Sequence, residues 1–167
     1  APDFLERLAG SRPSAAASPA SVRAVRDLSR LADEAARVGL RIPETHATPC
    51  GLPVDGSFLV KPWASVGGQG IARWHGGAEP DRPSLWQRVH PGTPHGVSLV
   101  LAESQPPQLL GVCRSLRCLA ATAAPGCAYA GSVTVPPPAW VDSIITLAGR
   151  LASQHGLRGA VGIDCIE

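Results

Sequence analysis

The chain has 167 residues, which is enough for one ordinary domain or two small lobes. Its net charge of +2 at pH 7 is too small to favour nucleic acid or an anionic membrane as a partner. No segment approaches the roughly 20 consecutive apolar residues of a membrane span. The five cysteines are odd in number and lack CxxC spacing, so we expect reduced thiols in a cytoplasmic protein rather than zinc ligands or disulfides.

The first third of the chain predicts a linker and then one helix. Residues 11–20 are small, nearly uncharged and rich in Ser, Ala and Pro, as linkers are. Apolar residues then recur at three- and four-residue steps as far as Val38, which predicts an amphipathic helix with Ser18 or Ser21 as its cap. Gly39 suits the position just after a helix end.

Short apolar runs between turn residues predict a series of strands in the rest of the chain. Two pairs among them have the spacing of antiparallel hairpins, 58–62 with 71–74 and 97–102 with 109–119. A second amphipathic helix is expected over 139–155, ended by Gly156. The remaining expected strands are 39–45, 85–89, 129–135 and 159–167.

The most informative stretch lies within the first predicted hairpin, 58–62 with 71–74. It contains Lys61, the only lysine of the chain, followed by a loop with Gly67, Gly68 and Gly70. Lysine supplies a compact positive charge on a flexible stem, and glycines let backbone N–H groups close around an anion. This order predicts a hairpin that binds nucleotide phosphates. The alternatives are a solvated lysine at a strand end and an ordinary glycine turn.

Three other polar residues are candidates for chemistry. Asp164 lies in an apolar strand, where an unpaired carboxylate is costly, so it is either a metal ligand or the partner of Arg150 or Arg158. Arg114 and Arg117 face opposite sides of the strand 109–119, so either could reach a phosphate or face solvent.

The order of these segments resembles the ATP-grasp superfamily of carboxylate–amine and carboxylate–thiol ligases. The resemblance runs from the first helix through FLVKP, the GGQGI loop, WQRVHPGTPHGVSLVLA and YAGSVTVPP to LRGAVGIDCIE, and covers roughly residues 20–167. It implies an α+β fold in which two lobes with antiparallel sheets clamp a nucleotide. On this basis we expect an N-terminal segment, linker and linker helix over 1–50, a short lid over 51–89 and a larger lobe over 90–167.

The resemblance also implies roles for individual residues. Lys61 matches the lid lysine that contacts the α- and β-phosphates, and Asp164 matches a Mg²⁺ ligand of the family. Arg117 is the arginine that we assign to phosphate or substrate, and His95 is the polar residue that could replace a missing acidic ribose contact. The remaining implied nucleotide contacts are the phosphate loop Gly67, Gly68, Gln69 and Gly70 and the hinge Gln87, Arg88 and Val89, which reads the adenine edge.

The sequence also departs from the family pattern. The second metal-binding strand would follow Glu167, where the chain stops, and a lysine usually found near the first helix is replaced by Leu28. We therefore expect a partial or truncated domain, whose activity truncation could abolish. Apolar surface exposed by truncation would favour a homodimer.

The reaction that the resemblance implies begins with ATP and Mg²⁺. A small-molecule carboxylate is phosphorylated to an acylphosphate, and an amine then displaces the phosphate. This chemistry rests on positioning and charge neutralisation, and it agrees with a sequence that has no GxSxG, HExxH or GxxxxGK[ST] motif. The alternative function is a nucleotide-binding or assembly module without catalysis.

Overall fold

The computed structural model describes residues 16–64, 67–116 and 129–167. The chain divides into two compact units. The larger unit combines the described residues up to Ile42 with His95–Cys113 and Thr134–Cys165. The smaller unit combines the described parts of Pro43–Pro94 and Arg114–Val133 with Ile166–Glu167. In the described residues the larger unit combines helices with an antiparallel sheet, and the smaller unit contains an antiparallel sheet. This agrees with the predicted α+β fold.

The N-terminal helical region consists of two helices, α2 (Pro19–Val25) and α3 (Leu28–Ala36), so the prediction of one continuous helix is wrong. The break lies at Asp27, whose extended backbone lets its carboxylate accept hydrogen bonds from the amides of the next helix. A short side chain that bonds the backbone in this way favours a helix start over a helix interior. Ser18 caps α2, as predicted.

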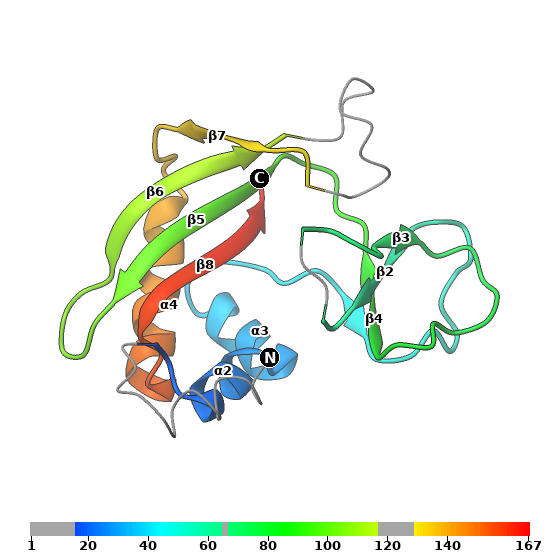
Figure 1. The fold of residues 1–167 in the computed structure, drawn as a ribbon, viewed down its shortest axis with the longest axis horizontal. Helices are drawn as coiled ribbons and strands as arrows, with labels where there is room; N and C mark the ends of the chain where they lie inside the picture. Colours follow the sequence, from blue (N-terminus) through cyan, green and yellow to red (C-terminus); the bar gives the residue numbers. More distant parts are fainter. Residues whose placement is uncertain (1–15, 65–66, 117–128) are drawn as a thin grey trace. The chain divides into compact units, whose positions relative to one another are not determined.

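The larger unit is a sheet with a helix on one face (Figure 1). The strand order is β7 (Ser132–Val135), β6 (Gln108–Ser115), β5 (Pro94–Leu101) and β8 (Gly159–Ile166), and the long helix is α4 (Val141–His155). Neighbouring strands run in opposite directions in Figure 1, which confirms the hairpin predicted for 97–102 with 109–119 as far as residue 115; residues 117–119 lie outside the described residues. Gly156 ends α4 with φ 63°, a backbone conformation that glycine adopts readily.

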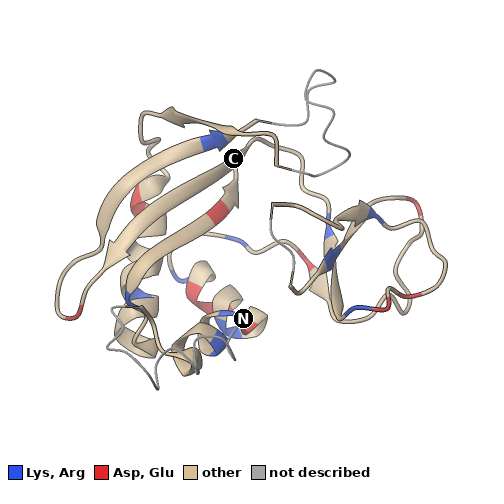
Figure 2. Ribbon diagram, in the orientation of Figure 1, with Lys and Arg blue, Asp and Glu red and all other residues tan. Residues whose placement is uncertain are grey.

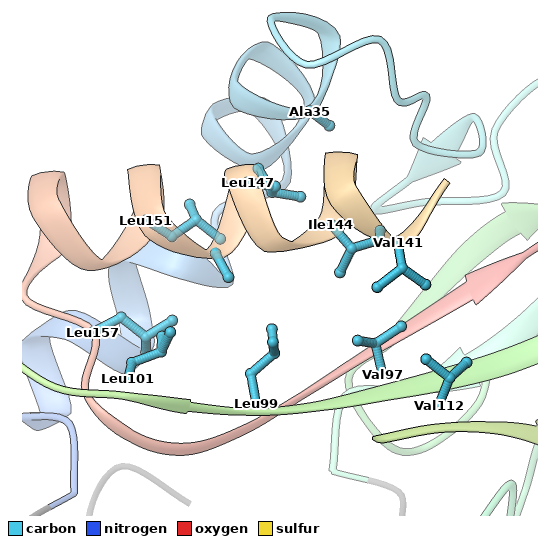
Figure 3. Packing of buried hydrophobic residues seen from close by; sticks show 11 residues of the cluster. Ala35, Val97, Leu99, Leu101, Val112, Val141, Ile144, Leu147, Leu151 and Leu157 are labelled. Atoms are coloured by element: carbon cyan, nitrogen blue, oxygen red, sulfur yellow. The ribbon is translucent and has the colours of Figure 1, made fainter. Parts of the chain in front are cut away.

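The core of this unit lies between α4 and the sheet. Figure 3 shows apolar side chains of α4 pointing toward those of β5 and β6. Alternate residues of β5 are buried toward the helix, and the opposite face of the sheet is more exposed. Residues with their side chains in this core include Val97, Leu99, Leu101, Val112, Val141, Ile144, Leu147 and Leu151.

The smaller unit contains an antiparallel sheet of four strands in the order β1, β4, β2, β3. They are β1 (Thr45–His46), β2 (Phe58–Pro62), β3 (Ala72–Arg73) and β4 (Ser84–Arg88). The pairing of β2 with β3 confirms the predicted hairpin. The strand predicted over 39–45 is wrong, because Leu40 and Ile42 pack against the core of the larger unit and pairing starts only after Pro43.

One face of the small sheet is buried and the other is half-buried. Phe58, Val60 and Trp86 lie on the buried face and form a cluster with Trp74. The indole rings of Trp74 and Trp86 meet edge to face with centroids 5.8 Å apart. Among the described residues no helix is both long enough and apolar enough to cross a membrane.

Candidate functional site

Lys61 lies on β2, on the half-buried face of the small sheet. The register pairs Lys61 with Leu85 and Leu59 with Gln87, so Lys61 and Gln87 are diagonal neighbours on the same face. Lys61 Nζ donates a hydrogen bond to Gln87 Oε1 at 3.0 Å. Two residues that the sequence assigned to phosphate and base recognition are therefore in direct contact.

Thr45 extends this contact into a chain of hydrogen bonds. Gln87 Nε2 donates to Thr45 Oγ1 at 3.1 Å, and Thr45 Oγ1 donates to the Pro43 carbonyl at 2.7 Å. Sequence reasoning did not find Thr45, because it lies 42 residues before Gln87 and in a strand of only two residues. Only the pairing of β1 with β4 brings the two together. We call this set the Lys61–Gln87–Thr45 chain.

A second polar cluster surrounds Arg88. Glu44 accepts from Arg88 Nε at 2.5 Å and from His46 Nε2 at 2.8 Å. The Arg88 guanidinium carbon also lies 4.6 Å from the centroid of the Phe58 ring, within the range of a cation–π contact. The hydrogen bonds from His46 and Arg88 hold the pKa of the Glu44 carboxyl below its ordinary value. The Arg88 side chain is thus occupied by structural contacts.

The backbone of the predicted hinge is also engaged. The amide of Arg88 donates to the Glu44 carbonyl and the amide of Val89 donates to the Ser57 carbonyl, both at 2.8 Å. These two N–H groups are therefore not available to a base edge in this conformation. A backbone contact from either residue to a base would have to use a carbonyl oxygen.

The glycine loop follows β2 and leads into β3. Gly67, Gly68 and Gly70 have φ values of 63°, 75° and 74°, in the left-handed region that favours glycine. A Cβ on Gly70 would lie 3.2 Å from Pro62 Cγ, so this glycine also permits a close approach. Gln69 lies between them in the turn. The loop has the backbone freedom that an anion-binding loop needs, and an ordinary turn would share that freedom.

Asp164 belongs to the larger unit and lies on the exposed face of β8, opposite the face that packs on α4. It is the only acidic residue of that strand (Figure 2). Neither arginine considered as its partner reaches it, since Arg150 pairs with Glu34 and Arg158 bonds the Ala16 carbonyl. A Cβ on Gly96 of the neighbouring strand β5 would lie 3.7 Å from Asp164 Oδ1.

Two other predicted residues have different outcomes. His95 is only 5 % exposed, and its ring meets Trp140 edge to face at 5.3 Å. His95 is thus buried against Trp140, and its contact with a ribose stays a prediction. Arg117 lies outside the described residues, whereas Arg114 is exposed near the end of β6.

Comparison with known proteins decides the family. Residues 26–167 match the ATP-grasp domain family. The chain belongs to this family. An ATP-grasp superfamily protein from Archaeoglobus fulgidus aligns with a TM-score of 0.66 and 18 % identity, over 99 % of this chain and 49 % of that protein. A comparison with curated proteins found no match.

Solved ligase structures share the ATP-grasp fold with this chain. An L-amino acid ligase from Bacillus licheniformis aligns with a TM-score of 0.62 and 14 % identity, over 99 % of this chain and 42 % of the ligase. N5-carboxyaminoimidazole synthetase from Staphylococcus aureus, complexed with ADP, aligns with a TM-score of 0.65 and 7 % identity, over 98 % and 46 %. The chain thus spans about half the length of these relatives.

The side chains of this ATP-grasp domain can be compared with the ligands that Mg²⁺ prefers. No group of three or more His, Cys, Asp or Glu side chains forms a metal site in the described part of the chain. The single carboxylate of Asp164 supplies too few ligands for a Mg²⁺ ion that is bound by protein side chains alone. Mg²⁺, however, often takes one or two carboxylates together with phosphate oxygens and water. Asp164 therefore fits a magnesium ion that arrives with a nucleotide.

Proposed function

We propose that this ATP-grasp domain is the nucleotide-binding part of an ATP-dependent ligase that joins a carboxylate to an amine. The observation that carries the proposal is the position of Lys61. The only lysine of the chain lies on the half-buried face of the small sheet, in contact with Gln87 and just before a loop with three left-handed glycines. The ligase and ADP-bound relatives with the same fold support it.

In the proposed reaction the protein acts through charge and position. The Lys61 ammonium neutralises phosphate oxygens, and the glycine loop offers backbone N–H groups to the same anion. Asp164 would contribute one carboxylate to the Mg²⁺ that accompanies ATP, and the ion would offset phosphate charge. The carboxylate substrate attacks the γ-phosphorus and ADP leaves. An amine then attacks the acylphosphate carbonyl, and phosphate leaves, so no protein nucleophile is needed.

Thermal unfolding with and without Mg-ATP tests nucleotide binding. A ligand at 100 times its dissociation constant adds about 2.7 kcal/mol to the free energy of unfolding, which raises the melting temperature by several degrees. We expect this rise in the wild type and its loss in Lys61→Ala. Arg82→Ala removes the same charge from an exposed position in the same unit and is the matched control. An unchanged wild-type melting temperature would contradict the proposal.

A non-catalytic nucleotide-binding or assembly module is the alternative function. It is favoured by the described residues, in which no group of three or more His, Cys, Asp or Glu side chains could hold a metal ion. ADP release in the presence of a mixture of amino acids separates the two. ADP formation that depends on both a carboxylate and an amine supports the ligase, whereas Mg-ATP binding without any ADP formation supports the module.

A further inference from the structure

We infer that Thr45 is a positioning residue of the phosphate-binding lysine, because it fixes which end of the Gln87 amide faces Lys61. The role of Lys61 toward phosphate rests on the proposed function above. The position of Thr45 rests on the hydrogen bonds of the structure alone. The role of Thr45 and the proposed function of Lys61 can therefore be tested separately.

The direction of the hydrogen bonds follows from chemistry at both ends of the chain. The Pro43 carbonyl can only accept, so it takes the single hydroxyl hydrogen of Thr45. Thr45 Oγ1 is then an acceptor toward Gln87, and only the amide nitrogen of Gln87 can donate to it. At the other end the Lys61 ammonium can only donate, so it needs the amide oxygen. Both ends require the same orientation of the amide.

The surroundings of Thr45 keep its hydroxyl in place. Thr45 and Gln87 are register partners on β1 and β4, so their side chains share one face of the sheet. The preceding residue, Glu44, is held to Arg88 by a side-chain ion pair and by a backbone hydrogen bond. The two-residue strand β1 therefore has a second attachment beside Thr45, and its hydroxyl remains against the Gln87 amide.

Without the Thr45 hydroxyl only Lys61 orients the Gln87 amide, and the amide loses its attachment to β1. A turned amide would present its NH₂ group to the Lys61 ammonium, which places two donors against each other. Lys61 would then lose its acceptor and its fixed direction. A hydrogen bond of this kind contributes on the order of 1 kcal/mol net, so its loss changes an equilibrium by about fivefold. Thr45 thereby controls the direction of the Lys61 ammonium, which is the only side-chain ammonium group in the sequence.

The single lysine gives a direct test. Limited acetylation with N-hydroxysuccinimide acetate modifies only Lys61 and the N-terminal amine, and peptide mass spectrometry reports both rates. In the nucleotide-free protein we expect Thr45→Val to raise the acetylation rate of Lys61, relative to the N-terminal amine, by about fivefold. Thr45→Ser keeps the hydroxyl, and we expect it to remain within about twofold of the wild type.

A double-mutant comparison tests whether Thr45 acts through Gln87. In a Gln87→Leu background, Thr45→Val should add no further increase. An increase of the same size in both backgrounds would overturn the inference, as would equal rates for Thr45→Ser and Thr45→Val. A rate for Thr45→Val equal to that of the wild type would also overturn it. If Thr45→Val has no cooperative melt, Thr45→Ala takes its place in the same comparison.

Mg-ATP binding forms a separate arm of the experiment. If the wild type binds Mg-ATP, we expect Thr45→Val to weaken binding by about fivefold and Thr45→Ser to leave it unchanged. If the wild type binds no Mg-ATP, the proposed function fails. The acetylation rates still decide whether Thr45 orients the Gln87 amide.

Discussion

Glu34 on α3 and Arg150 on α4 form an ion pair, with Glu34 Oε2 2.6 Å from Arg150 Nε. The second carboxylate oxygen lies 3.5 Å from Arg37 Nε. Glu34 is buried, whereas exposed pairs contribute little to stability. This pair joins the N-terminal helices to the helix that covers the large sheet, and removing Glu34 would leave the Arg150 guanidinium without this partner.

The hydrogen bond from Arg150 holds the pKa of the Glu34 carboxyl below its ordinary value. A lowered folded-state pKa stabilises the protein fully above about pH 4.3, the ordinary glutamate pKa, and this contribution disappears as the pH falls through the lowered value. We expect Glu34→Gln to lower the melting temperature at pH 7 and to approach the wild type as the pH falls below about 4. Thermal melts across this range measure the difference. Exposed Glu79→Gln should follow the wild type throughout, and a Glu34→Gln difference that stays constant down to pH 3 would contradict the assignment.

Asp27 separates α2 from α3 by capping the second helix. Asp27→Ala removes the acceptor for the amides of Ser29 and Arg30, and we expect a loss of about 1 kcal/mol in the free energy of unfolding. Urea denaturation measures this loss. Asp27→Ser keeps an acceptor and should retain most of the stability. If the alanine variant were as stable as the wild type, the two helices would not depend on this cap.

Leu99 is fully buried between the large sheet and α4. Leu99→Ala should lower the free energy of unfolding by about 2–5 kcal/mol, because it removes buried methyl groups and leaves a cavity. Leu110→Ala deletes the same atoms from a side chain that is 64 % exposed, and its effect should stay within about 0.5 kcal/mol. Equal losses in the two variants, measured by urea denaturation, would show that Leu99 is not in a packed core.

Gly92 lets the end of the chain approach the segment before β5. The Thr93 and Glu167 backbones exchange two hydrogen bonds, of 2.9 and 3.0 Å, beside a glycine with φ 142°. A Cβ on Gly92 would lie 2.3 Å from the Glu167 carbonyl oxygen, so Gly92→Ala should separate the pair. We expect amide exchange at Thr93 and Glu167 to become faster while exchange in α4 is unchanged. Gly111→Ala, whose Cβ meets nothing within 4 Å, should leave both amides protected.

Local patterns predicted the parts of the fold that local chemistry controls. The hairpin around Lys61 and the long helix α4 follow from short apolar runs, helical periodicity and glycine ends. The same reasoning failed at Asp27, where a helical pattern continues through a residue whose side chain starts a new helix. Periodicity indicates which face of a helix is buried and does not indicate where one helix ends and the next begins.

The partners of charged and polar side chains could not be predicted in the same way. Asp164 and Arg150 are close in the sequence, which suggests a pair. Arg150 instead bonds Glu34 on α3, which lies 116 residues earlier in the chain. Thr45 had no signal at all, because its role depends on the register between two strands far apart in the chain. Such contacts require the tertiary structure, since many residues of the right chemistry compete for each partner.

The discontinuous make-up of the two units has a consequence for synthesis of the protein. Strand β5 lies between β6 and β8 in the sheet, and β8 follows both β6 and α4 in the chain. During translation β5 therefore has one unpaired edge after β6 and α4 have already emerged. An unpaired edge is a template for strands of other chains, and slow non-local pairing prolongs its exposure. The β5 edge is thus an aggregation hazard until β8 emerges, and a ribosome-associated chaperone that covers this edge would reduce the hazard.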